Sequence, residues 1–351
     1  MAQAKERDTN LELFRIILMI AIIAHHYVVN SGVIEIMREE SLSGKLFFLY
    51  FIGAWGKTAI NCFVMITGYY MCKSNVRIKK VLTLFLQVKF YSIGIYVLFC
   101  IAGYETLSLT GMLDRIVPIH RIETNFTDCF LVFYLLIPIL NILTKNMNRK
   151  QHEYLLAIIG IIYVGLGTIK QVKINYVSWF AIVYFIAAYI RIYPREIYAN
   201  KQLWRVLSLA IFLLGGGSIF FMLMTNREGY YYVEDSNTVM AISLAVSLFL
   251  YFKNIEIKNS KIINSIASTT FGIFLIHTNS DSMRVWLWKK TVRVTEIYLK
   301  HDLKIIALHV VLSSALIFVA CMVIDKLREK LLEKPLLTYM NKFNWINARI
   351  E

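Results

Sequence analysis

The sequence is poor in charged residues, in proline and in closely spaced cysteines, and each shortage excludes a class of protein. Charged residues make up only 17% of the 351 residues, compared with about 25% in soluble domains, which argues against a soluble enzyme. The five cysteines are scattered, so we expect neither a disulfide framework nor a metal site. Four prolines provide few of the interrupted helices on which transporters build ion sites, which counts against transport.

Long apolar blocks are what the sequence has instead. Hydrophobic residues make up 58% of the chain, in blocks close to the ~20 residues that a helix needs to cross a ~30 Å hydrocarbon layer. The blocks do not alternate polar with apolar residues as barrel strands do. We therefore predict one domain over residues 1–351, an all-α polytopic membrane helical bundle with ten transmembrane helices. The predicted crossings are 13–29, 54–71, 81–102, 126–143, 155–169, 176–192, 204–224, 238–252, 262–277 and 305–324.

Lysine and arginine are unevenly divided between the two sides of this bundle. They are more numerous on the side of the N-terminus, and cytoplasmic loops hold such an excess, so both termini are predicted to be cytoplasmic, with residues 326–351 as a short basic tail. The net charge of +15 is explained in this way, and we expect no nucleic acid partner. The loop between crossings nine and ten is nevertheless basic. Two explanations of this basic loop stay open: it faces an acidic glycan, or a helix has been miscounted.

The first crossing has three ionisable side chains on one face. A helix turns ~100° and rises ~1.5 Å per residue, so His26 lies within ~20° of Arg15 and ~16 Å further along the axis. Glu12 is on the same side and can pair with the guanidinium, whereas His25 is rotated away. Charges inside a membrane span are costly and usually functional. The alternative is that Arg15 snorkels to the inner surface while His26 bonds a neighbouring helix.

Four segments along the chain share their order and spacing with a known family. The first is LELFR at 11–15 with His26 following, and the others are NCFVMITGY at 61–69, YLLIPILN at 134–141 and TFGIFLIH at 270–277. Taken as a set they resemble membrane acyltransferase family 3. The sequence departs from the family pattern at Glu12, where aspartate is usual, and at Thr67, where serine is usual. Lys80 stands where some members carry a second arginine after Arg77, which replaces a bidentate phosphate fork by a point charge.

The resemblance implies transfer of an acyl group, most often acetyl from acetyl-CoA, to a hydroxyl group of a cell-surface polysaccharide or its lipid-linked precursor. It implies His26 as the catalytic base, Arg15 as a stabiliser of the oxyanion or of the imidazole's surroundings, and Glu12 as the residue that orients it. Whether His26 carries the acyl group covalently stays open. His277, His25 and Asn61 are assigned to substrate binding, although His277 can equally be an interfacial histidine with a satisfied hydrogen bond.

The donor is expected from the cytosol. It would pass the basic cluster of Arg77, Lys79 and Lys80, which bind its phosphates or serve only as a topology signal. Acetyl-CoA is thus a co-substrate, and no permanently bound cofactor is expected. Two further lysines, Lys57 and Lys89, are expected to snorkel.

The expected partners are the bilayer, an acyl-CoA and a polysaccharide or lipid-linked oligosaccharide, in the cytoplasmic membrane of a bacterium; a homo-oligomer is compatible with the sequence. The alternative function is a carrier or flippase for a lipid-linked sugar. The enzyme is favoured because the charges gather in the first helix instead of being duplicated in two halves of the chain.

Overall fold

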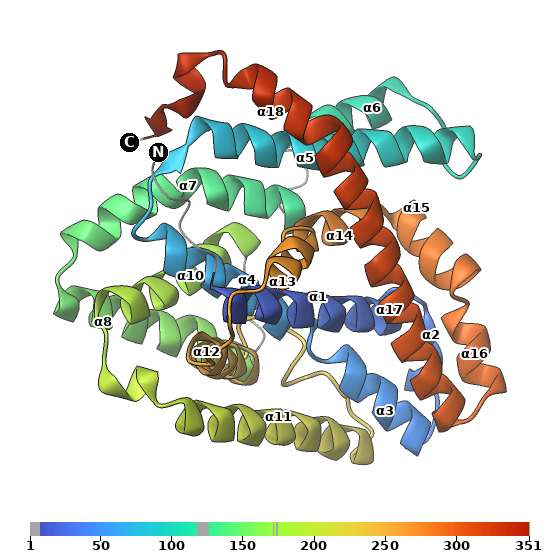
Figure 1. The fold of residues 1–351 in the computed structure, drawn as a ribbon. Coiled ribbons are helices and arrows are strands. Elements are labelled where there is room, and N and C mark those ends of the chain that lie inside the picture. Colours follow the sequence, from blue (N-terminus) through green and yellow to red (C-terminus); the bar gives the residue numbers. More distant parts are fainter. Residues whose placement is uncertain (1–7, 118–125, 171, 173–174, 351) are drawn as a thin grey trace.

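The computed structural model describes residues 8–117, 126–170, 172 and 175–350, and this part of the chain is mostly helical (Figure 1). Its β-structure is one antiparallel ladder of two residues on each side, in which Val76 pairs with Ile350 and Arg77 with Arg349. The elements in chain order are α1 (Thr9–Val29), α2 (Val33–Arg38), α3 (Gly44–Gly53), α4 (Gly56–Met71), β1 (Val76–Arg77), α5 (Ile78–Ile101), α6 (Leu109–Ile116), α7 (Phe126–Asn146), α8 (Arg149–Ile159), η1 (Gly160–Gly165), α9 (Leu166–Ile169), α10 (Tyr176–Ile192), η2 (Glu196–Ala199), α11 (Lys201–Met224), α12 (Val239–Lys253), α13 (Lys261–Ala267), α14 (Thr270–His277), α15 (Asp281–Arg284), η3 (Val285–Thr291), α16 (Val294–Lys300), α17 (Leu303–Arg328), η4 (Glu329–Glu333), α18 (Lys334–Met340), η5 (Asn344–Asn347) and β2 (Arg349–Ile350).

The prediction of an all-α membrane bundle is confirmed. Seven helices or helix runs are long and apolar enough to cross a membrane, and α10 and α12 are shorter apolar helices. The predicted ninth crossing, 262–277, is divided between α13 and α14, so no single helix covers it. The number of ten crossings therefore stays a prediction. The seven candidate spans are Thr9–Val29, Gly44–Met71, Ile78–Ile101, Phe126–Asn146, Arg149–Ile169, Lys201–Met224 and Leu303–Met340.

Polar caps fix where several helices begin. Asn148 and Gln151 form a reciprocal capping box at the start of α8. The Ser280 side chain accepts a hydrogen bond from the Met283 backbone N–H and so starts α15. This cap matters for function because α15 carries Arg284, which lines a cavity described below.

Helix α1 is the central element of the bundle. It packs against α3, α4, α12, α13, α14 and α17, and Figure 1 shows it between α11 and α12 on one side and α5 and α18 on the other. Apolar side chains such as Phe14, Ile23 and Tyr27 are almost completely buried around it. Of its ionisable residues, Glu12 is buried and Arg15, His25 and His26 are partly buried among the neighbouring helices, which is the setting in which an intramembrane ionisable group finds partners.

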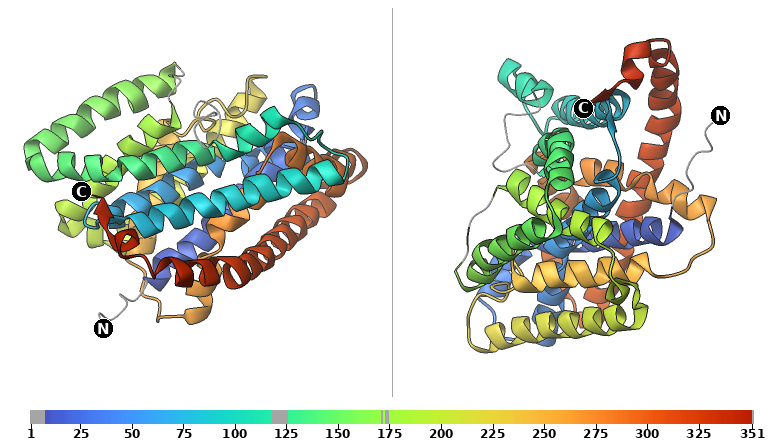
Figure 2. Two further views of the ribbon diagram at one scale, coloured as in Figure 1. Left: turned by 90° about the horizontal axis from the view of Figure 1, so that it is seen from above. Right: turned by 90° about the vertical axis from the view of Figure 1, so that its left-hand side faces the viewer.

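Both described ends of the chain lie at the same end of the bundle (Figures 1 and 2). Asp8, just before α1, accepts a hydrogen bond from the Tyr70 hydroxyl at the end of α4, and β2 pairs with β1, which follows α4. The segment expected as a short basic tail, 326–351, continues α17 into η4 and α18 and ends in this ladder. That this end faces the cytoplasm stays a prediction.

Candidate functional site

Two histidines from distant parts of the chain meet near the ends of α1 and α14. His26 Nδ1 lies 3.1 Å from His277 Nε2, and His277 Nδ1 lies 2.6 Å from the backbone carbonyl oxygen of Ile273. A carbonyl only accepts, so His277 Nδ1 carries a hydrogen and, in a neutral ring, its Nε2 is an acceptor. His26 Nδ1 then donates to it. This assignment leaves the lone pair of His26 on Nε2, which has no hydrogen-bond partner among the described residues.

His26 lines a chamber of about 480 Å³, which is within the ~300–1,000 Å³ typical of small-molecule sites. The chamber is mostly polar. Its lining residues are Ile22, His25, His26, Asn30, Gly56, Lys57, Ile60, Phe126, Thr127, Tyr176, Phe274, Thr278, Asn279, Ser280, Asp281 and Arg284.

His25 also lines this chamber but is held from the side of α3 and α4. Its Nδ1 bonds the backbone carbonyl oxygen of Gly53. Its ring lies against Gly56, where an added Cβ would be only 2.3 Å from His25 Cγ. The glycine is therefore needed for this close approach, and the sequence prediction that His25 is the secondary histidine fits its different set of contacts.

Arg15 lines a second cavity of about 240 Å³. Arg15 Nη1 lies 3.4 Å from Glu12 Oε1, while Glu12 Oε2 is buried and has no hydrogen-bond partner among the described residues. The remaining polar lining comes from Thr67, Gln87 and Thr270, among several phenylalanine side chains. An arginine in the lining of a mainly apolar pocket suits a ligand with a few polar groups.

The two cavities adjoin along α1. Four side chains line both of them: Ile22, Ile60, Phe126 and Phe274. Arg15 and His26 thus line neighbouring spaces with a shared apolar partition.

The other predicted site residues lie elsewhere. Asn61 is fully buried: its Oδ1 accepts from Trp179 Nε1 at 2.7 Å and its Nδ2 donates to the Ser236 carbonyl at 2.7 Å. These bonds give Asn61 a packing role between helices, and it lines neither cavity.

The predicted phosphate cluster lies at the end of the bundle that carries the ladder. Arg77 is in β1, and Lys79 Nζ donates to Asn341 Oδ1 at 2.6 Å. None of Arg77, Lys79 and Lys80 lines the Arg15 cavity. Their assignment to the donor's phosphates stays a prediction.

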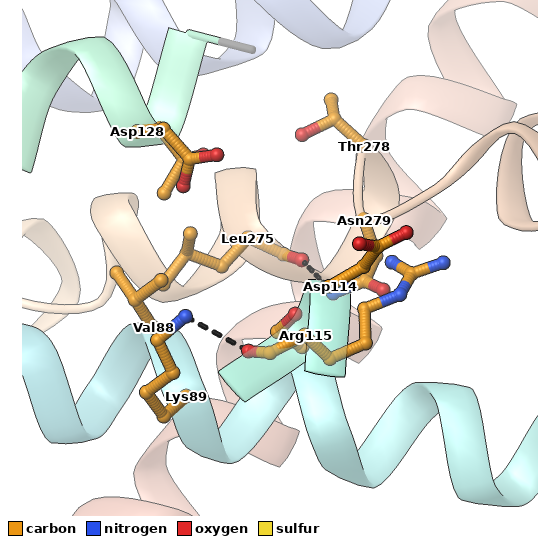
Figure 3. A pocket seen from close by; sticks show the side chains of 10 residues that line it. Val88, Lys89, Asp114, Arg115, Asp128, Leu275, Thr278 and Asn279 are labelled. Atoms are coloured by element: carbon orange, nitrogen blue, oxygen red, sulfur yellow. Dashed lines mark hydrogen bonds between the residues drawn. The ribbon is translucent and has the colours of Figure 1, made fainter. Parts of the chain in front are cut away.

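Two lysines that the sequence analysis expected to snorkel are turned inward. Lys57 lines the chamber of His26. Lys89 is buried, and its Nζ donates to the Arg115 carbonyl at 2.8 Å, the contact drawn between them in Figure 3. Lys89 and Arg115 line a small polar cavity of about 40 Å³ that shares Thr127, Thr278 and Asn279 with the chamber.

A buried carboxylate in α17 was missed because the predicted tenth crossing stopped at 324. Asp325 Oδ1 accepts hydrogen bonds from Arg328 Nε at 2.9 Å, Tyr91 at 2.7 Å and Gln87 at 3.3 Å. An added Cβ on Gly272 would lie 2.1 Å from Asp325 Cγ, so the carboxyl group rests on this glycine. The Asp-x-x-Arg spacing, which pairs charges on one helix face, was the signal available in the sequence.

Of three comparisons with known proteins, one gives a match. A family model described as an acyltransferase domain matches residues 8–326, which contain all the residues of the two cavities. No curated protein and no solved structure gives a match. Among the described residues, no group of three or more His, Cys, Asp or Glu side chains is placed to hold a metal ion.

Proposed function

From the premise that this chain belongs to acyltransferase family 3, we propose that it moves an acetyl or other short acyl group from acyl-CoA to a hydroxyl group of a cell-surface polysaccharide or its lipid-linked precursor. The family makes it a membrane acyltransferase. The donor, the acceptor and its place in the cytoplasmic membrane of a bacterium are our proposal. The observation that carries it is the free Nε2 of His26 in a polar chamber, with Nδ1 held by His277.

The free nitrogen supports a role of His26 as general base. A sugar hydroxyl is a poor nucleophile at neutral pH, and a positioned base contributes typically ~10²–10⁴-fold. His26 Nε2 accepts the hydroxyl proton as the oxygen attacks the thioester carbonyl carbon. When the tetrahedral intermediate collapses, the C–S bond breaks, the new ester remains, and the imidazolium returns the proton to the departing thiolate. His277 holds the ring in the required tautomer through its own bond to Ile273.

The position of Arg15 supports a role toward the donor. It lies ~16 Å from His26 along the helix axis, in the adjoining cavity. The Arg15 and His26 side chains are too short to reach the same thioester carbonyl across this distance. We therefore assign Arg15 to binding the extended arm of the donor and not to stabilising the oxyanion of the thioester. Glu12 holds the guanidinium from the neighbouring turn. The thioester end of the donor then lies at the partition formed by Ile22, Ile60, Phe126 and Phe274, where it can meet the acceptor hydroxyl in the His26 chamber.

The test is acetyl-CoA turnover by the purified chain with surface glycan of the host supplied as the hydroxyl acceptor, measured as thiol release, together with mass spectrometry of the surface glycans of the host with and without the gene. We expect turnover, and glycans that carry an additional acetyl group only when the gene is present. We expect His26→Ala to abolish both without changing the thermal unfolding midpoint. Unchanged turnover in that variant would remove His26 from the mechanism. Movement of a lipid-linked sugar across vesicles without thiol release would identify the carrier instead.

A further inference from the structure

The chamber beside His26 has an excess of positive charge. Its lining includes Lys57 and Arg284, and Asp281 is the one carboxylate among its lining residues. Lys57 Nζ donates to the Tyr176 hydroxyl and lies 5.1 Å from the centre of that ring. No carboxylate lies within ion-pair distance of Lys57 in the part of the chain that the structure describes. A charged ammonium group partly withdrawn from water without an opposite charge favours an anionic guest.

Arg284 has only a weakly held partner. Its Nη1 lies 2.7 Å from Asp281 Oδ1, but the Asp281 side chain is 88% exposed and that of Arg284 is 44% exposed. Exposed ion pairs of this kind contribute little and are readily exchanged. The planar guanidinium fork can therefore turn to a carboxylate or phosphate, for which its geometry is suited.

Both cations belong to the surroundings of His26. Lys57 and Arg284 line the same chamber as the His26 ring, although they come from α4 and α15. An anion held by them would thus be fixed close to the general base. Lys289 and Lys290, exposed on η3 directly after α15, add positive charge next in sequence to Arg284 and would draw a polyanion toward this part of the molecule.

We propose that the acceptor is an acidic sugar, whose carboxylate or phosphate binds between Lys57 and Arg284 and so places a neighbouring hydroxyl beside His26. This inference rests on the proposed function for the identity of the guest as acceptor. The binding of an anionic sugar to the chamber does not depend on it, because no acyl donor is involved. The basic outer loop that the sequence left unexplained is then the approach surface for an acidic glycan.

The experiment measures binding of small sugars to the full chain in nanodiscs, in the His26→Ala background so that nothing is turned over. The probes are glucuronate for the carboxylate, glucose 1-phosphate for the phosphate, and glucose as the neutral control. We expect one or both anions to bind, glucose to bind at least tenfold more weakly, and the affinity to fall with added salt. The two anions distinguish an acceptor with a carboxylate from one with a phosphate.

Charge variants locate the site. Lys57→Met and Arg284→Met are each expected to weaken anion binding at least tenfold, and Lys57→Arg to restore most of it. Lys201→Met, at the exposed start of α11, is the matched control, because it removes a cation that lines neither the chamber nor the approach surface, and it should leave anion binding unchanged. Unfolding midpoints show that each variant is folded. Equal binding of glucose and glucuronate, or an unchanged affinity in both Met variants, would overturn the proposal. If the anions bind but the wild-type chain, supplied with acetyl-CoA and the bound sugar as acceptor, releases no thiol, the anion site stands and the proposed acyl transfer is wrong.

Discussion

His26 and His277 are separated by 251 positions in the sequence, yet the two rings share one hydrogen bond of 3.1 Å. The pair is possible because α14 packs beside α1 and ends at His277. His277 is only 1% exposed and does not line the chamber, so we expect it to act through His26, while its predicted contact with a substrate stays a prediction. Together with the Ile273 carbonyl, it forms a chain of hydrogen bonds that fixes which nitrogen of His26 is free.

The first prediction concerns this pair. His277→Ala removes the acceptor for His26 Nδ1 and is expected to lower kcat by ~10–100-fold, the size of effect known for residues that orient metal-binding histidines. His277→Gln should recover part of the loss, because the amide oxygen is also an acceptor. Thiol release from acetyl-CoA measures both variants. Equal rates in the Ala and Gln variants would show that His277 fills space only.

The second prediction concerns Arg15. Arg15→Lys keeps the charge but loses the planar fork, so turnover should fall strongly. If Arg15 holds the donor's arm, as its separate cavity indicates, the loss appears mainly as a higher KM for acetyl-CoA. A change confined to kcat would instead return Arg15 to the oxyanion role. Arg227→Lys, on a loop outside both cavities, is the matched control and should leave both constants unchanged.

The first helix was readable from the sequence, whereas its partners were not. Helical periodicity alone puts Glu12, Arg15 and His26 on one side, because α1 is a regular helix from Thr9 to Val29. The packing of α14 against α1 joins segments that are far apart in the sequence. No local pattern therefore indicates that His277 would meet His26. The same holds for the Asn61 amide, whose bonds go to distant helices.

The lysines and Asp325 show where general expectations of membrane sequences fail. Snorkelling is the usual behaviour of a lysine in an apolar segment, but Lys89 finds a carbonyl inside the bundle. Asp325 lies between the last predicted crossing, 305–324, and the predicted tail, 326–351, so the sequence analysis assigned it to neither. The helix does not stop there, because Arg328, Tyr91 and Gln87 satisfy the carboxylate within the bundle.

The third prediction uses the contact between Gly272 and Asp325. In Gly272→Ala the new Cβ would meet Asp325 Cγ at 2.1 Å, so the buried ion pair must shift. We expect a loss of about 1–3 kcal/mol in the free energy of unfolding, as for other overpacked cores. Gly217→Ala in α11 is the control, since nothing lies within 4 Å of its added Cβ, and it should be neutral or slightly stabilising. Similar unfolding midpoints for the two variants would contradict the contact.

The fourth prediction tests whether donor and acceptor meet at the partition between the two cavities. Ile60 lines both cavities and is only partly buried, so Ile60→Trp adds bulk between the Arg15 cavity and the His26 chamber. We expect thiol release to fall at least tenfold, because the thioester can no longer reach His26 Nε2. Binding of acetyl-CoA, measured by calorimetry, should be largely retained, since Arg15 is untouched. The control is Ile20→Trp, on the exposed side of α1, which adds the same ring toward lipid. Wild-type turnover in the folded Ile60→Trp protein would mean that the acyl group reaches His26 by another route, and loss of turnover in both variants would mean that bulk on any face of the bundle disturbs α1.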